Sequence, residues 1–150
     1  MLTKKAKYAL KAALHLARRE PGEAVLIADI AGAERIPKKF LESILLALKN
    51  RGILVSRKGR GGGYTLARPA AEVSFGEIVR IMDGPLAPVP CVSVTAYRSC
   101  EECASEAGCE IRTVMKRVRD AISEVLDATT LADAIGRARP DPKRATRRPG

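Results

Sequence analysis

A chain of 150 residues has the length of one domain, alone or with a small appendage, and can bury a core without disulfides. Its formal net charge of +10 and its pI near 9.8 favour a polyanionic partner, either nucleic acid or an anionic membrane. No apolar run approaches the roughly 20 residues that cross a bilayer, and no signal peptide opens the chain, so we expect a cytoplasmic protein.

The first predicted helix begins after Thr3, which is suited to cap it, and runs to about Arg19. Its apolar stripe has the i, i+3, i+4, i+7 spacing of an amphipathic helix and consists of Leu10, Ala13, Leu14 and Ala17. Four lysines crowd its first half and either form a solvated face or contact phosphates: Lys4, Lys5, Lys7 and Lys11. The single histidine, His15, is interpreted as a helix-surface residue rather than a ligand.

Two further helices are predicted over 27–33 and over 37–50, joined by a turn at 34–36. Pro37 suits the first position of a helix, where its missing N–H costs nothing. The buried side of the later helix is expected to comprise Phe40, Leu41, Ile44, Leu45 and Leu48. The opposite side carries Lys38, Lys39, Glu42, Ser43 and Lys49. A helix with one buried and one exposed polar side is what a helix-turn-helix protein places in the major groove of DNA.

A glycine-tipped hairpin follows, with strands expected over 53–56 and 64–66. No apolar residue lies between Arg57 and Gly63, and the basic side chains there suit a narrow, electronegative minor groove. A phosphate-binding loop is the alternative for the three glycines. That motif requires Gly-Lys-Ser/Thr opening a helix, whereas Tyr64-Thr65-Leu66 is typical of a strand, so a winged helix-turn-helix is favoured.

The second half begins with a capping box, Ser74 to Glu77, which starts a helix that Asp83-Gly84-Pro85 ends. No period persists over 85–108. A long helix follows whose apolar residues recur at the alternating spacings of a coiled coil: Ile111, Met115, Val118, Ile122 and Val125. This stripe either packs on its own domain or forms a dimer, and dimerisation is favoured because helix-turn-helix proteins usually bind two half-sites.

The sequence therefore predicts a mainly α protein with a small β-hairpin wing. A winged helix-turn-helix DNA-binding domain is expected over 1–84 and a cysteine-rich sensor loop over 85–109. A dimerisation helix and a short terminal helix, started by Thr130 to Asp133, occupy 110–136, and a disordered basic tail 137–150. The expected DNA contacts are Lys38, Lys39, Glu42, Ser43, Arg57, Lys58, Arg60 and Tyr64. Glu42 either accepts a hydrogen bond from cytosine or pairs with Lys38 one turn away.

Five stretches carry a resemblance that spans residues 2 to about 135: Leu2-Thr3 with Tyr8-Ala9-Leu10, Phe40-Leu41-Glu42, the run from Gly59 to Ala67, Asp83-Gly84-Pro85, and the run from Thr130 to Asp133. The chain resembles the Rrf2 family of bacterial transcription regulators, which includes iron–sulfur sensors for cluster assembly, nitric oxide and iron. The resemblance implies a homodimer with crossed long helices and two winged domains on a palindromic operator. The family's DNA-contacting positions hold Pro37, Lys39, Glu42 and Lys58 here. Pro37 and Lys39 depart from the family pattern, so family operator preferences do not transfer to this chain.

All four cysteines, Cys91, Cys100, Cys103 and Cys109, lie in the predicted loop, and all but Cys91 have mainly polar neighbours. Four thiolates suit an iron–sulfur cluster, [2Fe-2S] or [4Fe-4S], or tetrahedral zinc, although only one C-x-x-C pair is present. A reversible disulfide, control by a protein partner, and cysteines without function are the alternatives. The resemblance matches Cys103 and Cys109 to the last two family ligands. It places Arg112 and Lys7 where some relatives have a histidine or an acidic ligand, so we expect four cysteine ligands.

Other function classes find little support in the sequence. No Ser/His/acid set and no cofactor fingerprint indicate an enzyme, and the basic tail lacks a hydrophobic membrane anchor. We therefore expect a homodimeric repressor that binds double-stranded DNA and is controlled by a cluster or by the redox state of the loop cysteines.

Overall fold

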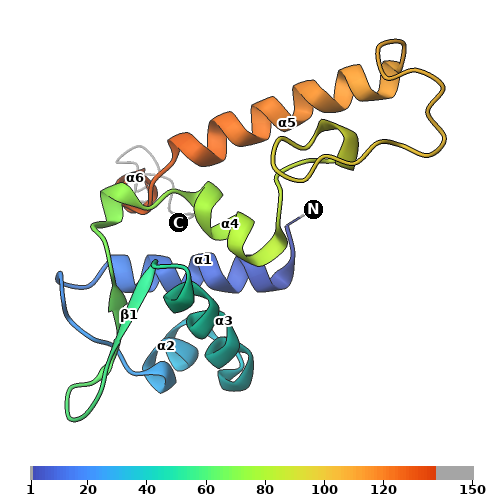
Figure 1. Ribbon diagram of the computed structural model, residues 1–150. Helices are drawn as coiled ribbons and strands as arrows, with labels where there is room; N and C mark the ends of the chain where they lie inside the picture. Colours follow the sequence, from blue (N-terminus) through green and yellow to red (C-terminus); the bar gives the residue numbers. More distant parts are fainter. Residues whose placement is uncertain (1, 138–150) are drawn as a thin grey trace, which may run out of the picture.

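The computed structural model describes residues 2–137. Along the chain its elements are α1 (Lys4–Ala17), α2 (Ile27–Glu34), α3 (Lys38–Asn50), β1 (Leu54–Arg57), β2 (Gly63–Leu66), η1 (Ala70–Glu72), α4 (Phe75–Asp83), η2 (Pro90–Val92), α5 (Glu110–Ala128) and α6 (Leu131–Arg137). Residues 2–84, called the head below, hold α1 to α4 and the hairpin, and α5 crosses above them (Figure 1). The predicted mainly α fold with one hairpin is confirmed. The disordered tail was predicted to begin at Arg137, but Arg137 is the last residue of α6, and the rest of the predicted tail, 138–150, lies outside the described residues.

The first helix is capped as predicted, because the Thr3 hydroxyl accepts a hydrogen bond from the Ala6 N–H at 3.1 Å. The helix ends at Ala17, two residues before the predicted end. The prediction for His15 was wrong: its side chain is buried, and its Nδ1 lies 3.1 Å from a Glu34 carboxylate oxygen. The reason is that α2 packs against α1 and covers this position.

The turn between α2 and α3 is tight because Arg35 adopts a left-handed conformation, with φ of 55°, and ends α2. Pro37 precedes α3 as its N-cap instead of occupying the predicted first helical position. Phe40 also departs from prediction, since it is 49% exposed and packs edge-to-face on Tyr8 with ring centroids 6.1 Å apart. Four other apolar side chains on α3 are fully buried and fix its orientation: Leu41, Ile44, Leu45 and Leu48.

The hairpin is antiparallel, with Leu54 opposite Leu66 and Arg57 opposite Gly63. Its second strand is also held from outside the hairpin, because Val25 and Tyr64 exchange two backbone hydrogen bonds of 2.8 Å. Gly63 is required at this approach: its φ is 134°, and a Cβ there would lie 2.2 Å from the Val25 carbonyl oxygen. The hydrogen bonds to Val25 therefore fix the hairpin on the rest of the head.

Both predicted capping boxes are present. Ser74 and Glu77 exchange side-chain and backbone hydrogen bonds of 3.2 Å at the start of α4, and Thr130 and Asp133 do so at 3.0 Å at the start of α6. Leu131, the first residue of α6, is fully buried in the same core as the head. The short last helix thus returns the chain to the head after α5.

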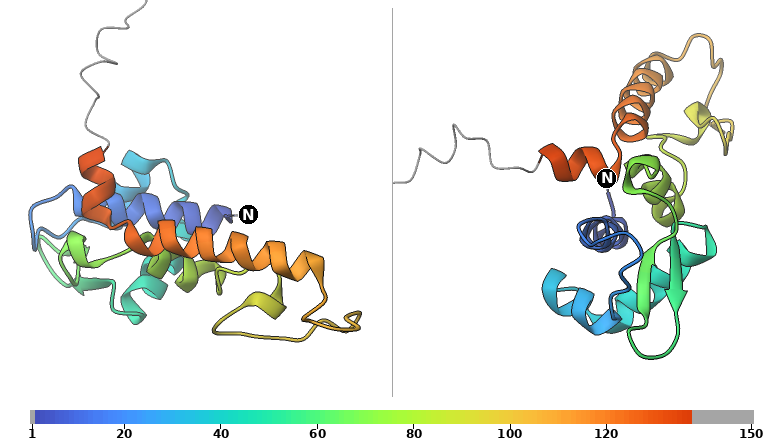
Figure 2. Two further views of the ribbon diagram at one scale, coloured as in Figure 1. Left: turned by 90° about the horizontal axis from the view of Figure 1, so that it is seen from above. Right: turned by 90° about the vertical axis from the view of Figure 1, so that its left-hand side faces the viewer.

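Helix α5 runs along one side of the head and projects beyond it toward the cysteine-bearing loop (Figure 2). No residue of α5 is buried. Its predicted stripe is open, with exposed fractions of 68% for Ile111, 64% for Val125 and nearly 40% for Val118 and Ile122. In the described part of the chain, the combination of length and apolarity that a membrane-spanning helix requires does not occur.

Candidate nucleic-acid interface and cysteine loop

Helix α3 presents the polar face that the sequence predicts. Its buried leucine and isoleucine side chains hold the helix against the head, and Lys38, Lys39, Glu42 and Ser43 are all exposed. The Ser43 hydroxyl donates to the Phe40 carbonyl at 2.9 Å, so it keeps its lone pairs free for an incoming donor. Within the described residues Glu42 forms no ion pair with Lys38, which was one of its two predicted states.

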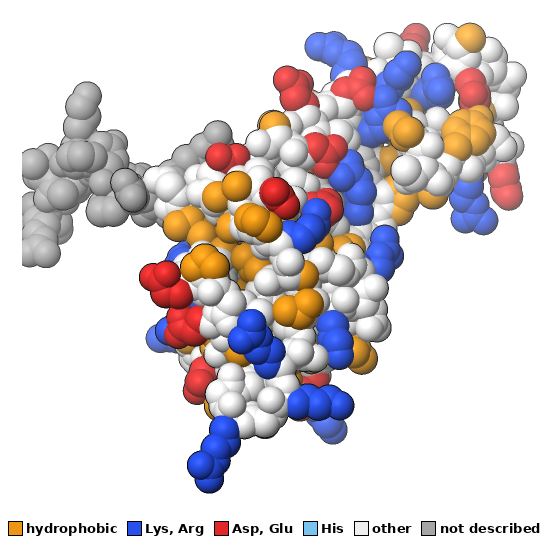
Figure 3. Space-filling model, turned by 60° about the vertical axis from the view of Figure 1, so that its left-hand side comes forward, with side chains coloured by type: hydrophobic (Ala, Val, Ile, Leu, Met, Phe, Trp, Pro, Cys, Tyr) orange, Lys and Arg blue, Asp and Glu red, His pale blue; other side chains and the backbone are white. Residues whose placement is uncertain are grey.

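The wing supplies the second group of cations. Arg57, Lys58 and Arg60 are exposed, whereas Tyr64 is half-buried in β2, where it lies opposite Ser56 and also pairs with Val25. Lysine and arginine side chains protrude from the lower end of the molecule in Figure 3, the end at which Figure 1 places the hairpin tip, α2 and α3. Helix α3 and the wing therefore offer cations at the same end of the head.

One exposed cation near this surface was not among the predicted contacts. Arg35 lies in the left-handed turn between α2 and α3, a few residues before the first predicted contact. The preceding residue is anchored by α1, because Lys11 donates to the Glu34 backbone carbonyl and His15 binds its carboxylate. The sequence shows that residue 35 is a cation, but it does not reveal the left-handed backbone conformation that directs its side chain outward.

The four cysteines are free thiols, and all of them line one hollow of about 590 Å³, called the thiol hollow below. Cys100 is exposed and the other three are partly buried. Two guanidinium groups, those of Arg98 and Arg112, line the same hollow, and the Arg112 Nε is buried without a hydrogen-bond partner among the described residues. Thiolates are the usual protein ligands of iron–sulfur groups, so the chemistry of the side chains in this hollow suits such a group.

The thiols are not gathered into a finished ligand set. No group of three or more His, Cys, Asp or Glu side chains in residues 2–137 is arranged to hold a metal ion. Cys109 instead caps α5, since its Sγ accepts from the Arg112 N–H at 3.4 Å. The expected ligation by all four cysteines stays a prediction.

Tyr97 and Glu106 close the middle of the cysteine loop. The Tyr97 hydroxyl donates to the Glu106 carboxylate, and this hydrogen bond to an anion raises the pKa of Tyr97 above its usual value. The bond joins residues on the two sides of Cys100 and Cys103 and keeps that segment a closed turn.

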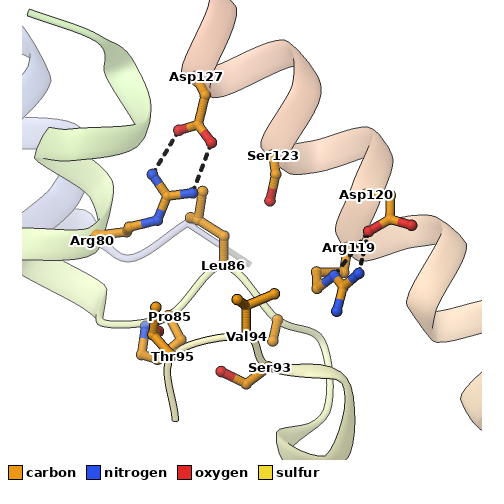
Figure 4. A pocket seen from close by; sticks show the side chains of 11 residues that line it. Arg80, Pro85, Leu86, Ser93, Val94, Thr95, Arg119, Asp120, Ser123 and Asp127 are labelled. Carbon is orange, nitrogen blue, oxygen red and sulfur yellow. Dashed lines mark hydrogen bonds and ion pairs between the residues drawn. The ribbon is translucent and has the colours of Figure 1, made fainter. Parts of the chain in front are cut away.

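The loop meets the head at a second hollow, of about 460 Å³, between α4, the segment 85–95 and α5 (Figure 4). On its wall Arg80 of α4 donates two hydrogen bonds, of 2.6 and 2.9 Å, to the carboxylate of Asp127 on α5. This pairing lowers the pKa of Asp127 and raises that of Arg80, in each case chiefly through the hydrogen bonds. Sequence analysis missed this pair because its members are 47 positions apart.

Comparison with known proteins gives the function class. The Rrf2 family, described as an iron-dependent transcriptional regulator, matches residues 2–137. A putative rrf2-like regulator of the helix-turn-helix type from Rhodobacter capsulatus is 44% identical over 146 residues, covering 95% of this chain and 97% of the relative.

Solved structures give the same assignment. CymR, the global cysteine regulator of Bacillus subtilis, superposes with a TM-score of 0.77 at 29% identity, covering 92% of this chain and 98% of CymR. CymR of Staphylococcus aureus in its oxidized form superposes with a TM-score of 0.69 at 29% identity, covering 89% and 94%. With its winged helix-turn-helix fold, the chain belongs to the Rrf2 family and is a DNA-binding transcriptional regulator, not an enzyme.

Proposed function

We propose that the protein is a sequence-specific repressor that binds a palindromic operator as a homodimer and acts in the cytoplasm under control of its loop cysteines. The observation that carries the DNA-binding part is the shared position of two cationic elements. Exposed lysines open α3, and Lys58 and Arg60 lie at the tip of a wing at the same end of the head. A helix in the major groove and a wing in the neighbouring minor groove would engage one half-site.

The second half-site requires a second copy, and the open stripe of α5 supports its docking there. Four of the stripe's five side chains are exposed β-branched residues, spaced as in a two-stranded coiled coil. An apolar row of this kind is stabilised when an identical row covers it. Crossed α5 helices would then set the distance between the two heads.

For the signal we propose an iron–sulfur cluster held by Cys91, Cys100, Cys103 and Cys109. The shared thiol hollow, the two guanidinium groups on its wall and the iron dependence of the family support this proposal. When bound, such a group would supply a centre that responds to iron, oxidants or nitric oxide. The chain's own part would be to gather the four thiols, which line one hollow, around such a group.

A second form of control is favoured by a specific observation. All four thiols are free, and one structural relative is known in an oxidized form. An oxidant that accepts two electrons would join two of the thiols in a disulfide, with the loss of two protons. Zinc or a protein partner acting on the same loop belongs to this cluster-free class. A brown anaerobic preparation containing sulfide supports the cluster. A colourless one that shifts on a nonreducing gel supports the disulfide.

The DNA-binding proposal is tested by selecting duplexes from a random library with the full-length protein. We expect a palindromic sequence bound at least about 10³-fold more tightly than random duplex at physiological salt. Lys58→Ala should weaken binding to both duplexes and reduce the salt dependence by about one phosphate contact.

The control for this experiment is Arg117→Ala, which removes an equal charge from an exposed position on α5. Glu42→Ala distinguishes the two predicted roles of that residue. If Glu42 contacts a base, the variant should lose base preference at one position of each half-site; if Glu42 only faces water, the selected sequence should not change. Equal affinity for selected and random duplexes would refute sequence-specific binding.

The four-cysteine proposal is tested with Cys91→Ala purified anaerobically, beside Ser99→Ala as a neighbour from the same hollow. We expect Cys91→Ala to lose most of its iron, sulfide and visible absorbance because one of four ligands is removed. Ser99→Ala should keep them. Unchanged iron content and spectrum in Cys91→Ala would show that Cys91 is not a ligand.

A further inference from the structure

Helix α5 is attached to the cysteine loop at two places. At its start the Cys109 sulfur caps the helix, and the Thr113 hydroxyl donates to the Cys109 carbonyl at 3.1 Å. Farther along, the Nη1 of Arg119 donates to the backbone carbonyl of Val92 at 2.5 Å. The last cysteine of the loop, Cys109, therefore contacts α5 directly, and the first, Cys91, is linked to the same helix through its neighbour Val92.

The second attachment holds the part of the loop that contains Cys91. Val92 and Ser93 are the buried residues of the segment 85–109, with exposed fractions of 2% and 7%. Cys91 lies in the same single turn, η2, which is closed by a Ser93 N–H bond to the Pro90 carbonyl at 3.1 Å. A shift of Cys91 must therefore carry the Val92 carbonyl with it, or open the turn.

The Arg119 side chain is built to hold that carbonyl in one position. Only 17% of the side chain is exposed. Its Nε donates to Asp120 Oδ1 at 2.9 Å, and its Nη2 binds the same oxygen, so the guanidinium is oriented by its neighbour (Figure 4). A planar guanidinium fixed on one edge presents its remaining donor in a defined direction.

The same face of α5 holds the head. Arg119, Ser123 and Asp127 follow at intervals of four and line the hollow between α4 and α5 (Figure 4). Asp127 receives the two hydrogen bonds from Arg80 of α4. Helix α4 lies so near that a Cβ on Gly76 would stand 2.0 Å from the Asp127 carboxylate. A displacement of α5 at Asp127 would therefore strain its hydrogen bonds to Arg80 of α4.

We propose that Arg119 is the positioning residue that transmits the state of the cysteine loop to α5, and through Asp127 and Arg80 to the DNA-binding head. The inference rests on the proposed control by the loop cysteines and holds for either a metal group or a disulfide. Gathering the thiols changes the position of Cys91 relative to Cys109, so the bond from Arg119 to Val92 is kept in one state and lost in the other. Only such a difference between states shifts a conformational equilibrium.

The test compares DNA affinity in two states of the full-length protein, using the selected duplex. One state is the reduced protein as purified anaerobically, and the other is the same protein stripped of iron by a chelator or, if colourless, oxidised to its disulfide. We expect the two affinities of the unaltered protein to differ by about 5- to 150-fold, the usual range of allosteric coupling. In Arg119→Gln the ratio should fall to within about twofold.

The matched control is Arg117→Gln, which removes the same charge from an exposed position of α5 and should keep the full ratio. Arg119→Lys should recover only part of it, because one ammonium cannot reproduce a guanidinium held on two edges. Iron and sulfide content, free-thiol count and urea midpoint are measured for each variant. A merely structural role of Arg119 would lower affinity equally in both states and leave the ratio unchanged.

The outcomes separate this inference from the proposed function. If the two states of the unaltered protein differ in DNA affinity and Arg119→Gln keeps that difference, the inference is overturned and control by the cysteines stands. If the two states of the unaltered protein bind DNA equally, the inference and control by the cysteines are both refuted, although DNA binding stands. Should Arg119→Gln not fold, Asp120→Asn takes its place, since it removes the carboxylate that orients Arg119 and keeps Arg119 itself. If both Asp120→Asn and Asp127→Asn keep the full ratio of DNA affinities between the two states, the inference is overturned.

Discussion

His15 and Phe40 occupy environments opposite to those expected from their chemistry. The imidazole is buried between α1 and α2 beside Glu34, whereas the phenyl ring is half-exposed on α3 and leans on Tyr8. In both helices the buried face is set by neighbouring elements. Phe40 immediately precedes Leu41, and successive residues of a helix are about 100° apart around its axis. Phe40 therefore lies outside the buried face that Leu41 occupies. Residue-level errors of this kind arise where a tertiary neighbour decides exposure.

The ion pair of Arg80 and Asp127 makes a pH-dependent prediction for a single residue. Its hydrogen bonds hold the pKa of Asp127 below the ordinary 3.8, so the ionised carboxylate is favoured in the folded protein. The resulting stability is present above pH 3.8 and is lost as the pH falls through the lower folded pKa. Because the two side chains are 36% and 45% exposed, Asp127→Asn should reduce the free energy of unfolding at pH 7 by only about 0.3–1 kcal/mol.

Urea unfolding at pH 7 and at pH 2.5 checks this prediction. The difference between Asp127→Asn and the unaltered protein should shrink at the lower pH. Glu124→Gln, which neutralises an exposed carboxylate on the same helix, should differ little at either pH. A difference for Asp127→Asn that is equal at both pH values would contradict the role of the ionised pair.

At the scale of elements, the starts of α1, α4 and α6 were predicted from local chemistry. Thr3, Ser74 and Thr130 each cap the helix that follows, because a capping side chain bonds to a backbone N–H only three residues away. The wing was predicted from its glycines and basic residues in the same way. Its attachment through Val25 was not, since that contact joins β2 to a segment before α2.

Helix α5 provides the prediction at this scale. Ile122→Glu places a carboxylate in the proposed seam, where pairing would bury it without a partner, so we expect the dimer to dissociate and operator affinity to fall at least about tenfold. Sedimentation velocity at micromolar concentration measures the assembly. Lys116→Glu puts the same residue on another exposed face of α5 and should leave the dimer intact. If Ile122→Glu kept the sedimentation coefficient of the unaltered protein, the stripe would not be the interface.

On the scale of the whole molecule, helix α5 links the three parts of the proposed mechanism. Its N-terminal end is capped by a cysteine, its apolar stripe is exposed and is the proposed dimer interface, and its Asp127 binds Arg80 of the head. The net charge of +10 favours DNA throughout, but charge alone gives no sequence preference. In the proposed dimer, specific binding would depend on how α5 spaces the two heads, which is where a signal at the cysteines would act.

The sequence by itself determined the family, the order of helices and wing, the exposed cations of α3 and the hairpin, and the concentration of thiols in one loop. These follow from periodicity, caps and spacing, which act over a few residues. Only the tertiary structure decided that His15 meets Glu34, that Arg119 holds the Val92 carbonyl and that Arg80 binds Asp127. Their separations of 19, 27 and 47 positions explain why, since the packing of whole elements brings such residues together and no local pattern records it.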